Sequence, residues 1–313
     1  MENRINIENC YHKPVMLTQC LEGLNIKPNG VYADVTFGGG GHSKAILEKI
    51  SNDGHLFAFD QDKDAVNNVI NSKNFTFFRT NFKYFHNFLR LVGHDKIDGI
   101  IADLGVSSHH FDCPERGFSY RFDTPLDMRM NQDMNLSAAD ILNTYSQQQL
   151  KNIFEQYGEI KNAWKLAQNI VEYRKNNVLK TSENFVAAAG KCIPQKQENK
   201  YLAMAFQALR IEVNQETDVL KKFLLQTTAA LKTGGRLVIM TYHSLEDRPV
   251  KNFIKAGNFT GNENKDIYGN IIAPFRAVNR KVTIPDQDEL QENSRSRSAK
   301  LRVAERTEYN FDN

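Results

Sequence analysis

Three aspartates and a run of glycines are the residues of this chain whose types and spacing could do chemistry. Residues 34–43 read Asp-Val-Thr-Phe-Gly-Gly-Gly-Gly-His-Ser, between an apolar extended run and a helical pattern. Consecutive glycines at a strand-to-helix junction let the backbone turn sharply and let a ligand approach without meeting a Cβ atom. The segment therefore predicts a nucleotide-binding loop. A flexible surface loop is the alternative, and the regular flanking pattern argues against it.

The carboxylate of Asp34 narrows the kind of nucleotide. A loop that binds only a pyrophosphate gains nothing from a neighbouring anion, because the helix N-terminus already supplies the positive pole. S-adenosylmethionine carries a sulfonium and an ammonium group. An aspartate beside the glycines therefore favours this cofactor over a nicotinamide dinucleotide.

Asp60, Asp103 and Phe82 each have a predicted role and a simpler alternative. Asp60 follows the first glycine by about twenty residues, where an acid accepts hydrogen bonds from ribose hydroxyls, although it could also form a turn. Asp103, or a carbonyl near it, could accept hydrogen bonds from an exocyclic amine that is being methylated, or Asp103 could cap a helix. The ring of Phe82 could enclose an adenine or belong to the core.

Three further segments could contact a substrate. Residues 116–122 interleave cations and aromatic rings, as RNA-stacking surfaces and some solvated loops do. Residues 242–248 follow an apolar run and could form either a substrate contact or the capped start of a helix. Residues 293–302 place four cations in ten positions, which suits phosphate binding or an ordinary solvated face.

The elements that must position these residues alternate between strands and helices. Apolar runs predict strands over 30–36, 56–60, 75–78 and 97–103, and apolar residues three or four apart predict helices over 64–70 and 84–92. Such a series specifies an α/β fold with a parallel, doubly wound sheet. Its ligand lies at the carboxyl ends of the strands, where Asp60 and Asp103 stand.

The alternation stops between about residues 111 and 200. Only helix signals occur there, with capping boxes beginning at Ser137 and Ser146. The α/β pattern then resumes with helices over 201–213 and 217–231 and a buried strand over 236–241. In the tail we expect edge strands over 281–284 and 300–304, with an acidic loop over 286–293.

Composition excludes several classes of protein. The 313 residues are 41% hydrophobic and 25% charged with a net charge of +3, which is ordinary for a soluble globular protein. No apolar run approaches the roughly 20 residues that cross a bilayer, and the first residues lack the apolar core of a signal peptide. The four cysteines are scattered without a CxxC pair, so we expect reduced thiols, no metal site and a cytoplasmic location.

Several segments together resemble the bacterial 16S rRNA cytosine-N4 methyltransferase family (RsmH, also called MraW). The glycine loop alone would specify only a nucleotide binder, whereas PLDMRM, FQALRI and HSLEDR in this order are specific. The matching segments are YHKPV at 11–15, the glycine loop through Ser43, DLGVSS at 103–108, RGFS at 116–119, PLDMRM at 125–130, FQALR at 206–210, HSLEDR at 243–248 and SRSRSAKLR at 294–302.

The resemblance implies a class I S-adenosylmethionine-dependent methyltransferase core, with a Rossmann-like doubly wound sheet, at 1–110 and 201–313. It also implies an inserted all-α substrate-recognition domain at 111–200. Asp103 becomes the expected catalytic residue. The family's cofactor positions fall on Gly40, Gly41, His42, Asp60, Phe82 and Asp103, and on His110, where the family usually carries Gln.

The implied reaction is methylation of N4 of a decoding-region cytosine, with S-adenosylmethionine as cofactor. We expect 16S rRNA, within the small ribosomal subunit, as partner and no membrane. Whether the protein is a monomer or a homodimer stays open. A non-catalytic RNA-binding or ribosome-assembly factor is the main alternative, although such a binder has no need for three acids around a glycine loop. An NAD-dependent oxidoreductase is the third reading.

Overall fold

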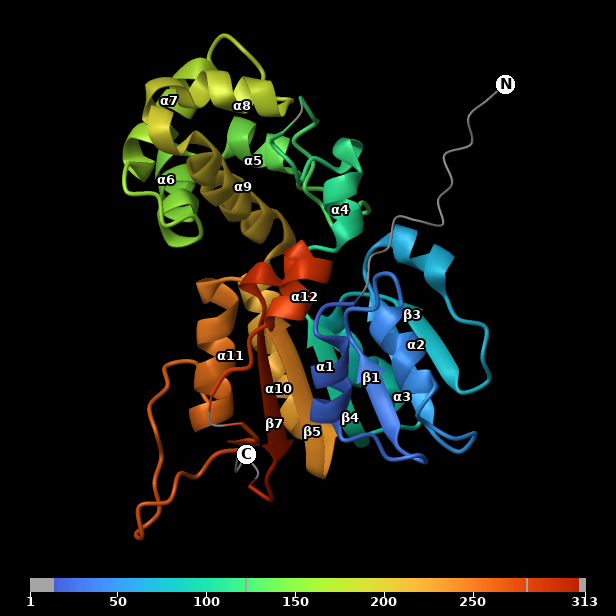
Figure 1. The fold of residues 1–313 in the computed structure, drawn as a ribbon. Coiled ribbons are helices and arrows are strands. Elements are labelled where there is room, and N and C mark those ends of the chain that lie inside the picture. Colours follow the sequence, from blue (N-terminus) through green and yellow to red (C-terminus); the bar gives the residue numbers. More distant parts are fainter. Residues whose placement is uncertain (1–13, 122, 280, 310–313) are drawn as a thin grey trace, which may run out of the picture. The chain divides into compact units, whose positions relative to one another are not determined.

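The computed structural model describes residues 14–121, 123–279 and 281–309, and the chain forms two compact units (Figure 1). One unit consists of residues 106–216. The other consists of the described parts of 12–105 and 217–313. Each unit has a hydrophobic core of its own.

The α/β unit is built on a seven-stranded sheet with the order β3-β2-β1-β4-β5-β7-β6 over the described residues. Strands β1 to β5 are parallel, whereas β7 is antiparallel to both β5 and β6. The chain runs outward from β1 to β3 and then returns to β4 on the other side of β1. Such a reversal marks the ligand crevice of a doubly wound sheet. The strands are β1 Val31–Asp34, β2 His55–Asp60, β3 Phe75–Arg79, β4 Ile97–Asp103, β5 Leu231–Thr241, β6 Phe275–Ala277 and β7 Lys300–Arg306.

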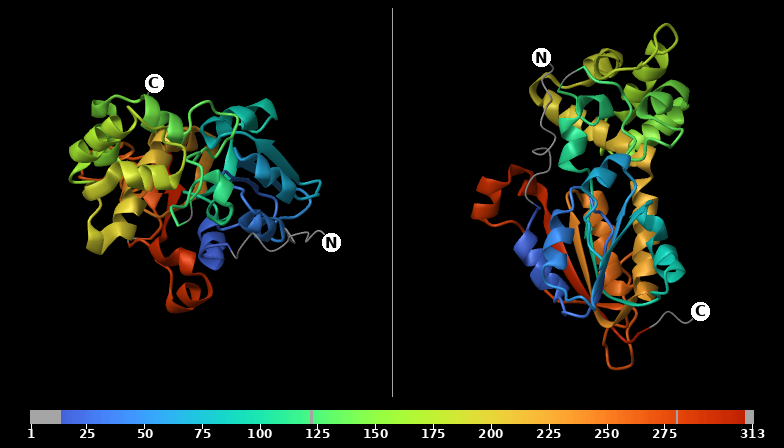
Figure 2. Two further views of the ribbon diagram at one scale, coloured as in Figure 1. Left: turned by 90° about the horizontal axis from the view of Figure 1, so that it is seen from above. Right: turned by 90° about the vertical axis from the view of Figure 1, so that its right-hand side faces the viewer.

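Helices cover both faces of this sheet (Figure 2). Neighbouring strand residues point to opposite faces, so Tyr32 joins the core under α1 and α2 while Ala33 joins the core under α3, α10 and α11. The helices of this unit are α1 Leu17–Leu24, α2 Gly41–Leu47, α3 Phe85–Leu91, α10 Glu216–Ala230, α11 Ser244–Ala256 and α12 Gln287–Glu292, with 3-10 turns η2 Lys63–Asn68, η3 Phe82–Tyr84 and η7 Ser294–Ser298.

The second unit is helical throughout its described residues. Helix α9 contacts α5 and α6, and α7 contacts α6 and α8. The capping boxes expected at Ser137 and Ser146 are present, and Ser107 and Thr181 begin two more. Its helices are α4 Ser108–Asp112, α5 Ala138–Thr144, α6 Gln147–Gln156, α7 Ala163–Tyr173, α8 Ser182–Ala189 and α9 Glu198–Asn214, with 3-10 turns η4 Pro114–Arg116, η5 Gly190–Cys192 and η6 Gln195–Gln197.

The tail departs from the sequence-based expectation. Residues 281–284 form no strand and contribute one isolated bridge, between Thr283 and Leu301. The acidic stretch expected as a loop contains α12, because Asp286 accepts a hydrogen bond from the Glu289 N–H and caps the helix. The strand β7, expected at an edge, lies between β5 and the short β6.

Two helices also differ from expectation. Helix α9, which the sequence analysis assigns to the α/β core, belongs to the helical unit, because Leu202, Phe206 and Leu209 lie in that unit's core. Helix α1 was not expected; it buries Cys20 and Leu24 against the sheet. Among the described helices, none is long and apolar enough to span a bilayer.

Candidate active site

Three carboxylates end three neighbouring strands of the sheet. Asp34 is the last residue of β1, Asp60 of β2 and Asp103 of β4, and β1 lies between the other two. All three strands are parallel, so these residues share the carboxyl edge of the sheet. The edge coincides with the point where the strand order reverses, which is where doubly wound folds bind their ligands.

The glycine loop joins β1 to α2 at this edge. Gly38 and Gly40 have φ values of +50° and +74°, in the left-handed region that favours glycine. A Cβ on Gly41 would lie 2.2 Å from Cγ of Pro14, and one on Gly40 would lie 2.9 Å from the ring of Phe37. The loop's own packing therefore requires glycine at these positions.

Asp34 holds the loop from within. It is 2% exposed, and its Oδ1 accepts from the N–H of Thr36 at 3.1 Å while its Oδ2 accepts from the hydroxyl of Ser43 at 2.7 Å. Burial raises the pKa of Asp34, and nearby His42 and these hydrogen bonds lower it. The sequence predicts this carboxylate beside a ligand, whereas in the structure both of its oxygens accept hydrogen bonds from the chain itself.

Asp60 also has bonds to the backbone but stays partly exposed. Its Oδ2 accepts from the N–H of Gly38 at 2.8 Å, and its Oδ1 accepts from the N–H of Asp62 at 2.8 Å. A carboxylate can accept several hydrogen bonds at once, and the partial exposure of Asp60 lets a ribose hydroxyl reach it. The ribose role remains a prediction that this position permits.

Asp103 makes hydrogen bonds through both its backbone and its side chain. Its N–H donates to the hydroxyl of Thr36 at 2.7 Å, and its Oδ1 accepts from the hydroxyl of Tyr242 at 2.6 Å. The pKa of Asp103 is raised to about 6. Burial is the main cause, and Asp34 and Glu246 also raise this pKa, whereas His42 and the Tyr242 hydrogen bond lower it. The negative charge of ionised Asp103 would stabilise a cation bound beside it.

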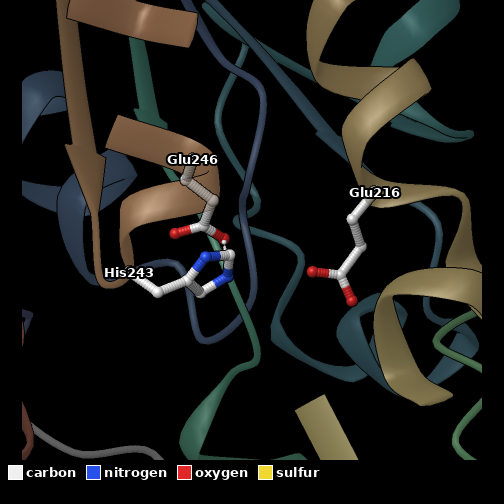
Figure 3. Close-up of side chains that lie close together, drawn as sticks. All are labelled: Glu216, His243 and Glu246. Atoms are coloured by element: carbon white, nitrogen blue, oxygen red, sulfur yellow. Dashed lines mark ion pairs between the residues drawn. The ribbon is translucent and has the colours of Figure 1, made fainter. Parts of the chain in front are cut away.

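Residues 242–248 contain the start of a helix, one of the two alternatives that the sequence left open, and a substrate contact there stays a prediction. The N–H of Tyr242 donates to Oε2 of Glu246 at 2.9 Å, and Nε2 of His243 lies 3.1 Å from Oε1 of Glu246 (Figure 3). His243 is the N-cap of α11. Glu216, drawn in the same view, pairs with Arg210 of α9 at 2.8 Å. The sequence could have indicated a role for Tyr242 at the site, because this residue directly follows β5.

The remaining predicted cofactor residues lie in three different elements. Phe82 begins η3 after β3, and its half-buried ring stands edge-on to Phe223 at 5.3 Å. His42 is buried in the first turn of α2, with Nε2 3.1 Å from the carbonyl of Val15. His110 belongs to the helical unit, where its side chain completes the capping box of α4. Their contacts with a cofactor stay predictions.

In the cation-aromatic segment, residues 116–120 are buried or half-buried, and Phe122 lies outside the described residues. Arg116 is 2% exposed and donates to the carbonyls of Arg129 and Met130 at 3.1 and 3.0 Å. Gly117 has a φ of +73°, and a Cβ there would lie 2.0 Å from the carbonyl oxygen of Pro125. Arg116 and Phe118 are therefore buried inside the helical unit, and their side chains offer no surface on which an RNA base could stack.

The cation-rich segment near the C-terminus divides into two parts. Arg302 is engaged within the fold, donating to the two carboxylate oxygens of Asp247 at 2.7 and 3.0 Å. Arg295 and Arg297 lie on η7 and are exposed. Lys300, which follows η7, pairs with Thr241 at the end of β5. This register places η7 near the carboxyl edge of the sheet.

The carboxylates at this edge suit a nucleoside cofactor that carries a positive charge. Asp60 and Asp103 present carboxylate oxygens on either side of the loop that begins α2. S-adenosylmethionine offers ribose hydroxyls for the first acid and a positive charge near the second. The residues present therefore fit this cofactor.

Comparison with known proteins gives matches over nearly the whole chain. Residues 9–307 match the MraW methylase family. A relative from Bacteroides fragilis named ribosomal RNA small subunit methyltransferase H is 54% identical over 299 residues, covering 96% of this chain and 98% of the relative. A relative of the same name from Christiangramia forsetii is 55% identical over 294 residues, covering 94% and 97%. The matches extend across both compact units.

Proposed function

The chain belongs to the MraW methylase family, and from that premise we propose that it methylates N4 of a cytosine in the decoding region of 16S rRNA. Membership makes it an S-adenosylmethionine-dependent rRNA methyltransferase, with a class I fold; the target atom is the part that we propose. The observation that supports it is Asp103, a carboxylate with a raised pKa at the carboxyl end of β4, beside the glycine loop.

The cofactor would be held by the edge formed by β1, β2 and β4. Asp60 would accept from its ribose hydroxyls, and the loop of Gly40 and Gly41 would pass close to it without a Cβ in the way. Phe82 would border the adenine. When bound, S-adenosylmethionine supplies an electrophilic methyl group on a sulfonium.

Asp103 would act on the acceptor amine. The lone pair of a cytosine amino group is delocalised into the ring, so the nitrogen is a poor nucleophile. A carboxylate that accepts a hydrogen bond from the amine localises this lone pair and orients the nitrogen. N4 would gain the methyl group as the bond between that carbon and the sulfonium sulfur breaks, and it would lose one proton, for which Oδ2 of Asp103 would be the acceptor.

The RNA would be recognised outside this edge as well. The target base must leave its stack to reach the site, so an unpaired or unstacked cytosine is required. We propose that the helical unit recognises the surrounding rRNA in the small ribosomal subunit, in the cytoplasm. Exposed Arg295 and Arg297 would bind flanking phosphates, which makes the activity sensitive to salt.

Nucleoside analysis tests the reaction. The purified protein is incubated with labelled S-adenosylmethionine and small ribosomal subunits from a strain that lacks the enzyme, and the digested 16S rRNA is analysed by mass spectrometry. We expect one label on N4 of a cytosine. Label on C5 or on a ribose oxygen, with none on N4, would refute the proposal.

A further inference from the structure

Tyr242, the residue after β5, makes hydrogen bonds to two acidic side chains at the carboxyl edge of the sheet. Its hydroxyl donates to Oδ1 of Asp103 at 2.6 Å, and its backbone N–H donates to Oε2 of Glu246 at 2.9 Å. Glu246 is 5% exposed, and its other oxygen lies 3.1 Å from the ring of His243. The tyrosine is therefore fixed at its main chain by Glu246 and at its phenol by Asp103.

The loop after β4 lies beside this tyrosine. Gly105 has a φ of +97°, and a Cβ there would lie 3.5 Å from Cδ2 of Tyr242 and 3.9 Å from Oε1 of Glu246. Asp103, two residues earlier, is anchored through its N–H on Thr36 at 2.7 Å. Thr36 thus holds the backbone of Asp103, and the phenol of Tyr242 holds one of its carboxylate oxygens.

This arrangement determines how the carboxylate of Asp103 is presented. The terminal torsion of an aspartate is broad, so a free carboxylate rotates over a wide range. A short O–H···O⁻ hydrogen bond is about twice as strong as a neutral one and fixes the plane of the group. Oδ1 accepts from Tyr242, and among the described residues no hydrogen bond to Oδ2 is found, so Oδ2 is the oxygen available to a substrate amine.

We propose that Tyr242 is a positioning residue for methyl transfer, which holds Asp103 so that Oδ2 faces the acceptor amine. The inference rests on the proposed function, because it gives Asp103 its role there. Tyr242 touches neither reacting atom in this account. It acts only through Asp103.

The same hydrogen bond also favours the ionised form of Asp103. Burial raises the pKa of Asp103, while His42 and Tyr242 lower it. Loss of the phenol hydroxyl therefore moves this pKa upward from about 6. The titratable groups that face Asp103 are Cys20 of α1, Asp34 of β1, His42 of α2, Tyr242 after β5 and Glu246 of α11.

The decisive variant is Tyr242→Phe, which removes one oxygen atom and keeps the ring. We expect kcat to fall about ten- to hundredfold, with KM for small subunits near the wild-type value. The acidic limb of the pH profile of kcat should move up by about one pH unit. Tyr268→Phe is the matched control, since Tyr268 is 83% exposed on a loop of the same unit; it should behave as wild type.

A double variant tests whether Tyr242 acts through Asp103. In an Asp103→Asn background, Tyr242→Phe should change kcat little further, because the group that it positions is already altered. Fully additive losses would overturn the proposal, as would an unchanged acidic limb in the single variant.

A measurement without RNA separates this inference from the proposed function. The side-chain carboxyl carbon of Asp103, labelled with carbon-13 and identified through Asp103→Asn, is titrated by NMR in wild type and in Tyr242→Phe. An upward shift of its midpoint in the variant supports the contact, even where nucleoside analysis places the methyl on another atom. Identical titrations overturn it.

Discussion

The ionised form of Asp103, present at neutral pH, lowers the stability of the folded protein. Its pKa is raised to about 6 from an ordinary 3.8, so the unfolded chain holds the charge more easily than the folded one does. Stability therefore falls as the pH rises from about 4 to about 6, and the loss then stays constant. At pH 8 the raised pKa lowers the free energy of unfolding by about 3 kcal/mol.

Replacing this carboxylate should consequently stabilise the protein while it inactivates it. We expect Asp103→Asn to raise the free energy of unfolding at pH 8 by up to about 3 kcal/mol, to lower methylation by orders of magnitude and to leave the stability near pH 4 unchanged. Urea denaturation of the cofactor-free protein at the two pH values, with methylation assays at pH 8, measures this. Equal stability of wild type and variant at pH 8 would contradict the cause assigned to the raised pKa.

Asp60 gives a prediction about the cofactor alone. A hydrogen bond to a charged group contributes roughly 1.5–3 kcal/mol, so Asp60→Ala should weaken S-adenosylmethionine binding about ten- to hundredfold. Calorimetry measures the affinity. Thermal unfolding checks the fold, because Asp60 also accepts from Gly38. The control is Asp53→Ala on an exposed loop. An affinity for the Asp60→Ala variant equal to that of wild type would remove Asp60 from the ribose site.

At the scale of elements, the end of α9 is tied to the segment that carries PLDMRM. Asn214 is 4% exposed; its Oδ1 accepts from the N–H of Met130 at 2.8 Å, and its Nδ2 donates to the carbonyls of Met128 and Arg210 at 2.8 and 2.9 Å. Met128 has a φ of +61°, an uncommon value outside glycine. The amide thus satisfies backbone groups of a turn that cannot pair within a helix.

Removing this amide should destabilise the helical unit. Asn214→Ala leaves buried N–H and carbonyl groups of residues 128–130 without that partner, and we expect a loss of about 2–4 kcal/mol in the free energy of unfolding. Urea denaturation measures it, with Asn152→Ala on the exposed face of α6 as control. A loss no larger than that of the control would show that the turn holds without this tie.

Elements with a strong local signal could be predicted from the sequence, and elements set by distant contacts could not. The strands β1 to β4 and residues 236–241 of β5 are largely apolar runs, whereas the polar first half of β5, from Leu231, was not predicted as strand. The helices after Ser137 and Ser146 have capping boxes. The three-residue β6 has too few residues for a pattern, and acids that resemble a loop instead cap α12. Arg116 looked exposed because nothing local shows that the carbonyls of Arg129 and Met130 accept from it.

The candidate site shows the same division. The carboxyl ends of β1, β2 and β4 follow from the strand pattern, so Asp34, Asp60 and Asp103 could be placed on one edge. Whether a carboxylate faces a ligand or the chain depends on donors elsewhere, as the hydroxyl of Ser43 shows for Asp34. The bond from Tyr242 to Asp103 joins residues 139 positions apart, which no local pattern reveals.

At the scale of the whole molecule, two separate cores predict two separable functions. The described cofactor-edge residues other than His110 lie in the α/β unit, while α5 to α9 enclose a core of their own. Replacing residues 111–216 by a short linker, which keeps His110, should leave S-adenosylmethionine affinity within a few fold of wild type and abolish methylation. Calorimetry and nucleoside analysis measure the two effects. Loss of cofactor binding in a well-folded deletion variant would show that the helical unit is needed for both.

The insertion point of the helical unit also sets the order in which the chain can fold as it leaves the ribosome. β4 ends at Asp103, and its neighbour β5 begins only at Leu231, after the whole insertion has been made. Helical units with near-neighbour contacts fold quickly, whereas distant strand pairings are slow. The nascent chain therefore carries an open β4 edge while the insertion folds beside it. Exposed strand edges favour aggregation, so the interval between these two strands is when the growing protein is most vulnerable.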